Sequence, residues 1–182
     1  MAYRTRTYVA GDWDNDKTAI DKLYSWNRNE NLGLSFTDAH DLKQARDSSL
    51  NCSIKSSLKS RLDASNKFVL IVGRSTNVVT AGSCRYCSSY NSYHHYCHRG
   101  YFVDYRGYIK YECDEAFKAY KEGKMKIIVL YNMRTVDRSK CPEILRNIGI
   151  HSSMGKIHED GECYYDYLTV KRAFDASELF LK

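Results

Sequence analysis

The stretch Phe68-Val-Leu-Ile-Val-Gly is an unbroken apolar run that closes with a glycine. A similar run, Lys126-Ile-Ile-Val-Leu-Tyr-Asn, occurs later in the chain. Strands of a parallel sheet look like this when helices cover both faces, because neither face then has to be polar. The two runs therefore predict two buried strands at the centre of a parallel sheet.

Weaker signals on either side of these runs complete the pattern. Further strands are expected at 5–11, at 32–38 and within 151–164, the last together with a hairpin. Helices are expected after a cap at Asp14 or Asn15, from about 47 to 62, around Glu112 and from 166 to 181. Strands that alternate with helices favour an α/β fold of three layers, with a flavodoxin-like order and a central, mostly parallel sheet of five strands. The chain, 1–182, is expected to be one domain with an insert at about 74–103.

Composition excludes several classes of protein. A net charge of +6 without a dense Lys/Arg run argues against a nucleic-acid groove. No apolar run approaches the roughly 18 residues of a membrane helix, and no apolar segment follows the first residues, so a cytoplasmic protein without a membrane partner is expected. Seven dispersed cysteines indicate reduced thiols or a metal site rather than a secreted disulfide framework.

Glu112 lies on the apolar stripe of its expected helix. Six residues mark that stripe: Tyr105, Tyr108, Ile109, Ala116, Phe117 and Tyr120. A carboxylate on an inward face costs free energy unless it is paired, hydrogen-bonded or facing a polar cleft. Carboxylates in such positions also acquire chemical roles. From periodicity alone, Glu112 is either the partner of a structural cation or a reactive group.

Two polar segments are expected beside the Glu112 helix, because ligands of such sheets bind outside the carboxyl ends of the strands. After the first strand, Asp12 and Trp13 are placed to contact a ribose or a base, or else to form a capping turn. Before the second helix, Arg46 and Ser48 are placed to hold a phosphate at the helix N-terminus, or else Ser48 belongs to a cap.

The insert carries a possible ligand set for zinc. Cys84 and Cys87 form a Cys-x-x-Cys pair, and Cys97 and His98 follow, which are residue types that bind zinc tetrahedrally. The second half lacks the usual finger spacing, so redox work by the Cys84/Cys87 pair and simple packing of thiols stay open as alternatives. Other chemistries are disfavoured: no Gly-x-Gly-x-x-Gly, Walker A or Gly-x-Ser-x-Gly motif occurs, which argues against dehydrogenases, P-loop ATPases and serine hydrolases of the elbow type.

The order of the motifs resembles the TIR-like domains of the Thoeris ThsB family of bacterial anti-phage defence. The resemblance covers about residues 5–175 and rests on five segments: Thr7-Tyr-Val-Ala-Gly-Asp-Trp-Asp-Asn-Asp, Asp38-Ala-His-Asp, Arg46-Asp-Ser-Ser, Phe68-Val-Leu-Ile-Val-Gly and Tyr108-Ile-Lys-Tyr-Glu-Cys. The last of these is the most specific. The insert departs from the family pattern, because it is longer than most TIR domains carry at this place.

The resemblance implies a TIR-like fold and an activity. Glu112 corresponds to the catalytic glutamate of enzymatic TIR domains, which cleave NAD⁺ at the nicotinamide–ribose bond. NAD⁺ is then a substrate and no cofactor is required. A cyclic ADP-ribose isomer as product, acting on a separate effector, is also implied. Tyr105 or Tyr108 would stack on a ring of the substrate, and Arg46 would meet its pyrophosphate.

Two other functions compete with this one. The first is a non-enzymatic TIR-like module that binds a nucleotide or assembles with partners, since TIR domains often self-associate. The second is a zinc-dependent interaction module built on the insert. Nicotinamide release separates the enzyme from both, and metal analysis of the purified protein separates the last two.

Overall fold

The computed structural model describes residues 6–32, 34, 36–38 and 50–179. The elements of the main layers are β1 (Arg6–Ala10), α1 (Lys17–Arg28), α2 (Asn51–Asp63), β2 (Ser65–Val72), α3 (Tyr108–Lys121), β5 (Lys126–Tyr131), β6 (Ile150–Ser153) and α4 (Tyr167–Leu179). The smaller elements are η2 (Cys84–Tyr86), β3 (Tyr90–Asn91), β4 (Tyr96–Cys97), η3 (Arg138–Lys140), η4 (Glu143–Leu145), β7 (Gly155–Ile157) and β8 (Cys163–Tyr165). In the described part of the chain, no helix is long and apolar enough to cross a membrane.

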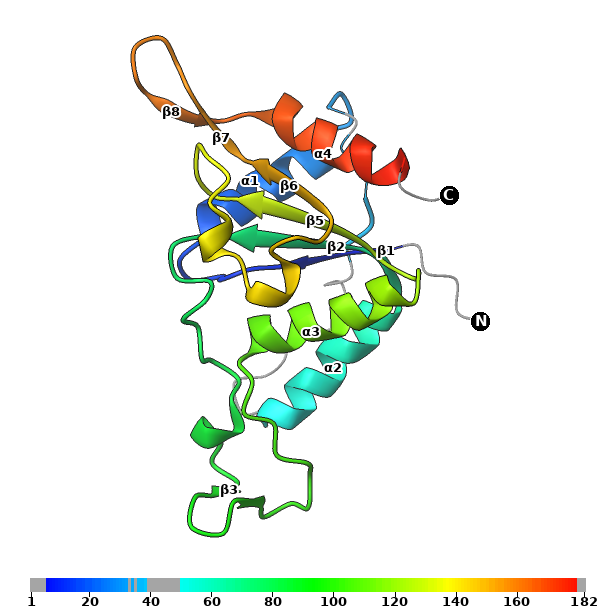
Figure 1. Ribbon diagram of the computed structural model, residues 1–182, viewed down its shortest axis with the longest axis vertical. Helices are drawn as coiled ribbons and strands as arrows, with labels where there is room; N and C mark the ends of the chain where they lie inside the picture. Colours follow the sequence, from blue (N-terminus) through cyan, green and yellow to red (C-terminus); the bar gives the residue numbers. More distant parts are fainter. Residues whose placement is uncertain (1–5, 33, 35, 39–49, 180–182) are drawn as a thin grey trace.

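The central sheet is parallel and has the order β1-β2-β5-β6 (Figure 1). The two apolar runs form β2 and β5, side by side at its centre, which confirms the α/β prediction. The described residues make four strands rather than five. The segment expected as a strand at 32–38 contributes one parallel bridge, Thr7 to Asp38, on the free side of β1. The segment does not pair further in part because the Asn27 side-chain amide binds both the N–H and the C=O of Phe36. These two backbone groups are then not available for hydrogen bonds to β1.

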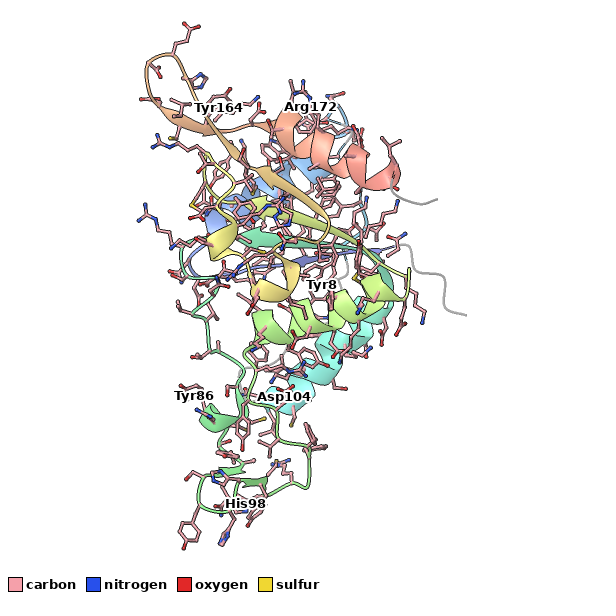
Figure 2. All side chains as sticks on the ribbon, viewed as in Figure 1. Tyr8, Tyr86, His98, Asp104, Tyr164 and Arg172 are labelled. Atoms are coloured by element: carbon pink, nitrogen blue, oxygen red, sulfur yellow. The ribbon has the colours of Figure 1, made fainter. Side chains whose placement is uncertain are left out.

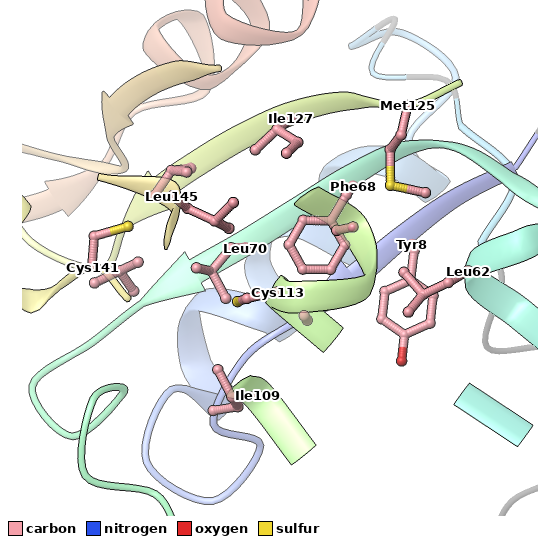
Figure 3. Packing of buried hydrophobic residues seen from close by; sticks show 14 of the residues in the cluster. Tyr8, Leu62, Phe68, Leu70, Ile109, Cys113, Met125, Ile127, Cys141 and Leu145 are labelled. Atoms are coloured by element: carbon pink, nitrogen blue, oxygen red, sulfur yellow. The ribbon is translucent and has the colours of Figure 1, made fainter. Parts of the chain in front are cut away.

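Side chains on the two faces of the sheet build two separate cores. Alternate residues of β2 point to opposite faces, so Phe68 and Leu70 enter one core while Val69 and Ile71 enter the other. Helices α2 and α3 cover the first face, part of which is shown in Figure 3. Helices α1 and α4 cover the second. This is the three-layer arrangement that the continuous apolar runs predict.

The helix starts differ from those expected. Helix α1 is capped at Asp16 rather than at Asp14 or Asn15, because the Asp12 carboxylate already accepts the N–H groups of both of those residues. Helix α3 begins at Tyr108, so Tyr105 precedes the helix instead of sitting on its stripe. The cap expected for α2 lies outside the described residues.

The segment between β2 and α3 leaves the body at the carboxyl end of β2 and carries the small β3–β4 hairpin at its far end (Figure 1). Its return to the body is held by Lys55 of α2, whose Nζ donates to the C=O of Arg106 at 2.6 Å and to the C=O of Asp104 at 3.1 Å. Lys55 is 4% exposed, so this anchor is part of the packed interior. The insert therefore projects from a firmly held base.

Candidate functional site

Glu112 is buried between α3 and the sheet, with 6% of its surface exposed. The hydroxyl of Tyr8, in the middle of β1, donates a hydrogen bond to Glu112 Oε1 at 2.5 Å. Tyr8 is fully buried and its ring stacks on Phe68 of β2 with centroids 5.9 Å apart. Because the buried tyrosine ring is held against Phe68, its hydroxyl orients the carboxyl of Glu112.

The surroundings keep the Tyr8 hydroxyl protonated. Burial raises the pKa of Tyr8 well above its usual value, and the negative charge of Glu112 adds to the rise. The cation of Arg61, from α2, opposes that rise. The hydroxyl is therefore a permanent donor toward Glu112. Sequence reasoning missed Tyr8, which counted only as a strand residue.

Tyr108 stands one turn before Glu112 on the same side of α3. Its hydroxyl donates to Asn51 Oδ1 at 3.0 Å, at the start of α2, and burial raises its pKa to about 12. The ring lies over Gly82, where an added Cβ would come within 2.3 Å of it. Tyr108, on α3, therefore contacts both the start of α2 at Asn51 and the insert at Gly82.

Asp12 and Trp13 occupy the turn after β1. Asp12 is 6% exposed, and its carboxylate accepts the Asn15 side-chain amide at 2.7 Å as well as two backbone N–H groups, so it organises the turn. Trp13 is 45% exposed and stacks on Tyr24 with centroids 6.1 Å apart. Of this pair, Trp13 is the one with an open surface toward solvent.

Asp16, at the end of the same turn, is a buried carboxylate that sequence reasoning treated only as part of a polar turn. It is 3% exposed and accepts a hydrogen bond from Asn132 Nδ2 at 2.7 Å, just after β5. Asn132 Oδ1 in turn accepts from Tyr165 at 2.8 Å. Burial raises the pKa of Asp16. The carboxylate packs against Gly73, where any Cβ would lie 2.0 Å from Oδ1, so the glycine makes this burial possible.

Of the other expected contact residues, the structure describes Tyr105. Tyr105 belongs to the insert, where its hydroxyl lies 3.1 Å from that of Tyr90 and the Arg85 guanidinium covers its ring. Arg46 and Ser48 lie outside the described residues. The site that the structure does describe is therefore made by β1, α3 and the start of α2.

An open cavity of about 1200 Å³ lies along the other side of α3. Helix α3 lines it with Ile109, Lys110, Cys113 and Asp114, whereas Glu112 does not. Its far wall comes from η4 and the residues around it. The helix thus separates the buried glutamate from this cavity.

The cysteines are all free thiols. Within the ranges that the structure describes, which include Cys84, Cys87, Cys97 and His98, no group of three or more potential ligands is placed to hold a metal ion. Cys84 is 6% exposed and its Sγ accepts the N–H of Asp104 at 3.3 Å, so this thiol helps to close the base of the insert. His98 lies instead against Tyr96, with Nδ1 3.2 Å from the tyrosine hydroxyl.

In a comparison with protein families, residues 7–80 match the Thoeris protein ThsB, TIR-like domain. The matched span includes β1, α1, α2 and β2, and with them Tyr8, Asp12 and Asp16. It ends before α3, so Glu112 lies beyond it. Comparison with curated proteins gave no match.

Proposed function

We propose that this chain cleaves NAD⁺ at the nicotinamide–ribose bond, with Glu112 as the catalytic residue, because residues 7–80 match the TIR-like domain of the Thoeris protein ThsB. The proposed product is a cyclic ADP-ribose isomer that signals to a separate effector in anti-phage defence. One observation carries the proposal. It is the buried Glu112 carboxyl, held by the hydroxyl of Tyr8 at 2.5 Å.

The chemistry needs one well-placed carboxylate. Departure of nicotinamide leaves an oxocarbenium-like ribose, as in glycoside cleavage. A preorganised negative charge stabilises that cation, and in a site with little water it does so more strongly than in solution. Nicotinamide leaves as a neutral molecule from a cationic precursor, so no general acid is required. The Tyr8 hydroxyl holds the Glu112 carboxyl in place because it donates to Oε1.

The substrate contacts proposed around Glu112 follow from the positions of the side chains. Tyr108 shares the side of α3 with Glu112 and is the nearest candidate for stacking on a ring of the substrate. Trp13 offers an exposed ring for the same purpose, while Asp12 acts through the turn that it organises. Arg46 and Ser48 stay proposed contacts for the pyrophosphate.

The test is mass spectrometry of the products after incubation with NAD⁺, with Glu112→Gln compared with the wild type. Glutamine keeps an oxygen that accepts from Tyr8, so the fold is preserved while the charge is removed. Nicotinamide release is expected to fall at least about 100-fold. The matched control is Glu115→Gln on the same helix, which weakens ion pairs with Lys118, Lys59 and Arg106 but leaves the bond between Tyr8 and Glu112 in place, and it is expected to stay active.

Unchanged turnover in folded Glu112→Gln protein would remove Glu112 from the mechanism. Because the isolated chain can be latent, the assay is run alone and with lysate of phage-infected cells, each against a Glu112→Gln reaction. Release that needs the lysate and needs Glu112 supports the proposal. A cyclic product in the same reaction supports its second part.

A non-enzymatic nucleotide-binding module is the second candidate. The observation that favours it is that Glu112 is only 6% exposed and does not line the 1200 Å³ cavity along α3. Calorimetric titration with NAD⁺ decides between the two. Binding without turnover, unaffected by Glu112→Gln but weakened by Lys110→Ala in the cavity wall, would favour the module.

A further inference from the structure

The insert exposes an unusual set of side chains. Among the described residues, thirteen large apolar or aromatic side chains are exposed, and six of these lie between 86 and 105: Tyr86, Tyr93, Tyr96, Tyr101, Phe102 and Tyr105. We call residues 85–105 the knob; it stands away from the layered body in Figure 2. Aromatic side chains concentrated on one projection mark an interaction surface, because scattered exposure would need no explanation.

The composition of the knob indicates the charge and kind of its partner. Residues 85–105 contain two arginines, three histidines, no Glu or Lys, and one Asp, Asp104, which is paired with Lys55 and Arg106. Tyr and Arg are enriched at protein interfaces and Lys is depleted, whereas nucleic-acid grooves use Lys freely. The knob is therefore suited to a protein surface that is acidic.

A small hollow in the knob is already organised to receive such a surface. It has a volume of about 470 Å³ and is lined by Arg85, Tyr90, Ser92, His95 and Tyr105. The Tyr90 hydroxyl lies 2.9 Å from His95 Nδ1, and the Arg85 guanidinium stacks 5.1 Å from the Tyr105 ring centre. His95 has a φ of 53°, and no other non-glycine residue in the described part of the chain has a positive φ. Rings held in this way lose little conformational freedom on binding.

An acidic projection lies at the opposite end of the molecule. The β7–β8 hairpin ends in Glu159, Asp160 and Glu162, all exposed, and its loop lies far from the knob along the longest axis (Figure 1). None of these three carboxylates takes part in the ion pairs found among the described residues. Its base is firm, since His158 stacks on Tyr164 with centroids 3.9 Å apart. The hairpin thus presents unpaired negative charge on a held scaffold.

We propose that the acidic hairpin tip of one copy of this chain docks into the knob of a second copy, head to tail. The two surfaces are different and lie at opposite ends of the molecule, so the contact is heterologous. A pair of copies therefore still has one free knob and one free tip. Repetition of the contact extends an open chain of copies. A tip in a shallow hollow buries a small area, so each contact is weak and sensitive to salt.

Sedimentation velocity over a concentration series, up to on the order of 1 mM at low salt, tests the proposal. The knob variant is Arg85→Glu with Arg99→Glu, and the tip variant is Glu159→Lys with Asp160→Lys and Glu162→Lys. Each variant alone is expected to associate at least about tenfold more weakly than the wild type. A mixture of the two variants is expected to associate again. The acidic tip of the knob variant can dock into the basic knob of the tip variant, and the basic tip of the tip variant can dock into the acidic knob of the knob variant.

Arg172→Glu, an exposed charge reversal on α4, is the control and is expected to associate like the wild type. Circular dichroism confirms that each variant is folded. A monomeric wild type throughout the series overturns the proposal, as does association that survives both variants or fails to return in the mixture. Arg85-dependent binding of a single-stranded oligonucleotide, without self-association, would identify a nucleic-acid surface instead. Glu112→Gln keeps the assembly intact, so this result is independent of the catalytic proposal.

Discussion

Glu112 and Asp16 are both buried carboxylates that accept a side-chain hydrogen bond, yet they sit in opposite layers. Glu112 lies in the layer of α2 and α3 and is bound by Tyr8 from the middle of a strand. Asp16 holds the N-cap position of α1 in the other layer, without a side-chain bond to the helix, and is bound by Asn132 just beyond a strand end. The same residue class is thus buried for two different reasons.

The difference lies in what each environment does to ionisation. Beside Glu112, burial and the charge of the glutamate raise the pKa of Tyr8, so a protonated hydroxyl faces the carboxyl. At Asp16, burial raises the pKa of the carboxyl itself, because desolvation outweighs the hydrogen bond from Asn132 and nearby Asp12 adds to the rise. Burial thus opposes the charge of the Asp16 carboxyl, whereas the group that faces Glu112 is a hydroxyl that stays protonated and donates to it.

The largest expected effect comes from Gly73→Ala, which attacks the Asp16 site directly. The new Cβ would lie 2.0 Å from Asp16 Oδ1, so the carboxylate has to leave Asn132. We expect a loss of about 2–4 kcal/mol in unfolding free energy, measured by urea denaturation.

A double-mutant cycle shows whether Asp16 is the cause. In an Asp16→Ala background, Gly73→Ala should cost at least about 1 kcal/mol less, since the clashing atoms are gone. Equal costs in both backgrounds would show that the cost does not come from the clash with Asp16.

Tyr8→Phe is expected to have the next largest effect, on the Glu112 side of the comparison. It removes the donor to Oε1 and keeps the ring against Phe68, so we expect a loss of about 1–3 kcal/mol. Nicotinamide release, if Glu112 is catalytic, should fall together with stability. In a Glu112→Ala background the same change should cost much less, and a cost that stays the same would show that the tyrosine acts through its other neighbours.

The smallest effect is a pH dependence at Asp16. A carboxyl with a raised folded pKa binds its proton more tightly in the folded state. Its contribution to stability is therefore fully present below the unfolded value of 3.8 and is lost as the pH rises through the folded pKa. Asp16→Asn should gain stability relative to the wild type as the pH rises from about 3.5 to 7, measured by urea denaturation at each pH. A difference that does not change with pH would contradict the raised pKa.

Much of the fold could be predicted because its signals are local. The runs at 68–72 and 127–131 became the two central strands, and the stripe through Ile109, Glu112 and Ala116 became the buried side of α3. The segment at 32–38 was harder to assign, since a side chain on α1 competes there for the backbone of Phe36. Tyr105 was misplaced because the start of α3 is set by Gly107 rather than by any pattern before it.

The sequence by itself determined that Glu112 would be buried, because helical periodicity and apolar neighbours act over a few residues. Only the tertiary structure decided what would meet it. Tyr8 is 104 positions away, and a contact of that separation exists only once β1, β2 and α3 have packed. The Asp16 site has the same origin, since Gly73 and Asn132 reach it from the ends of two neighbouring strands. Periodicity specifies which face of an element turns inward, while the partner on that face depends on how the layers pack.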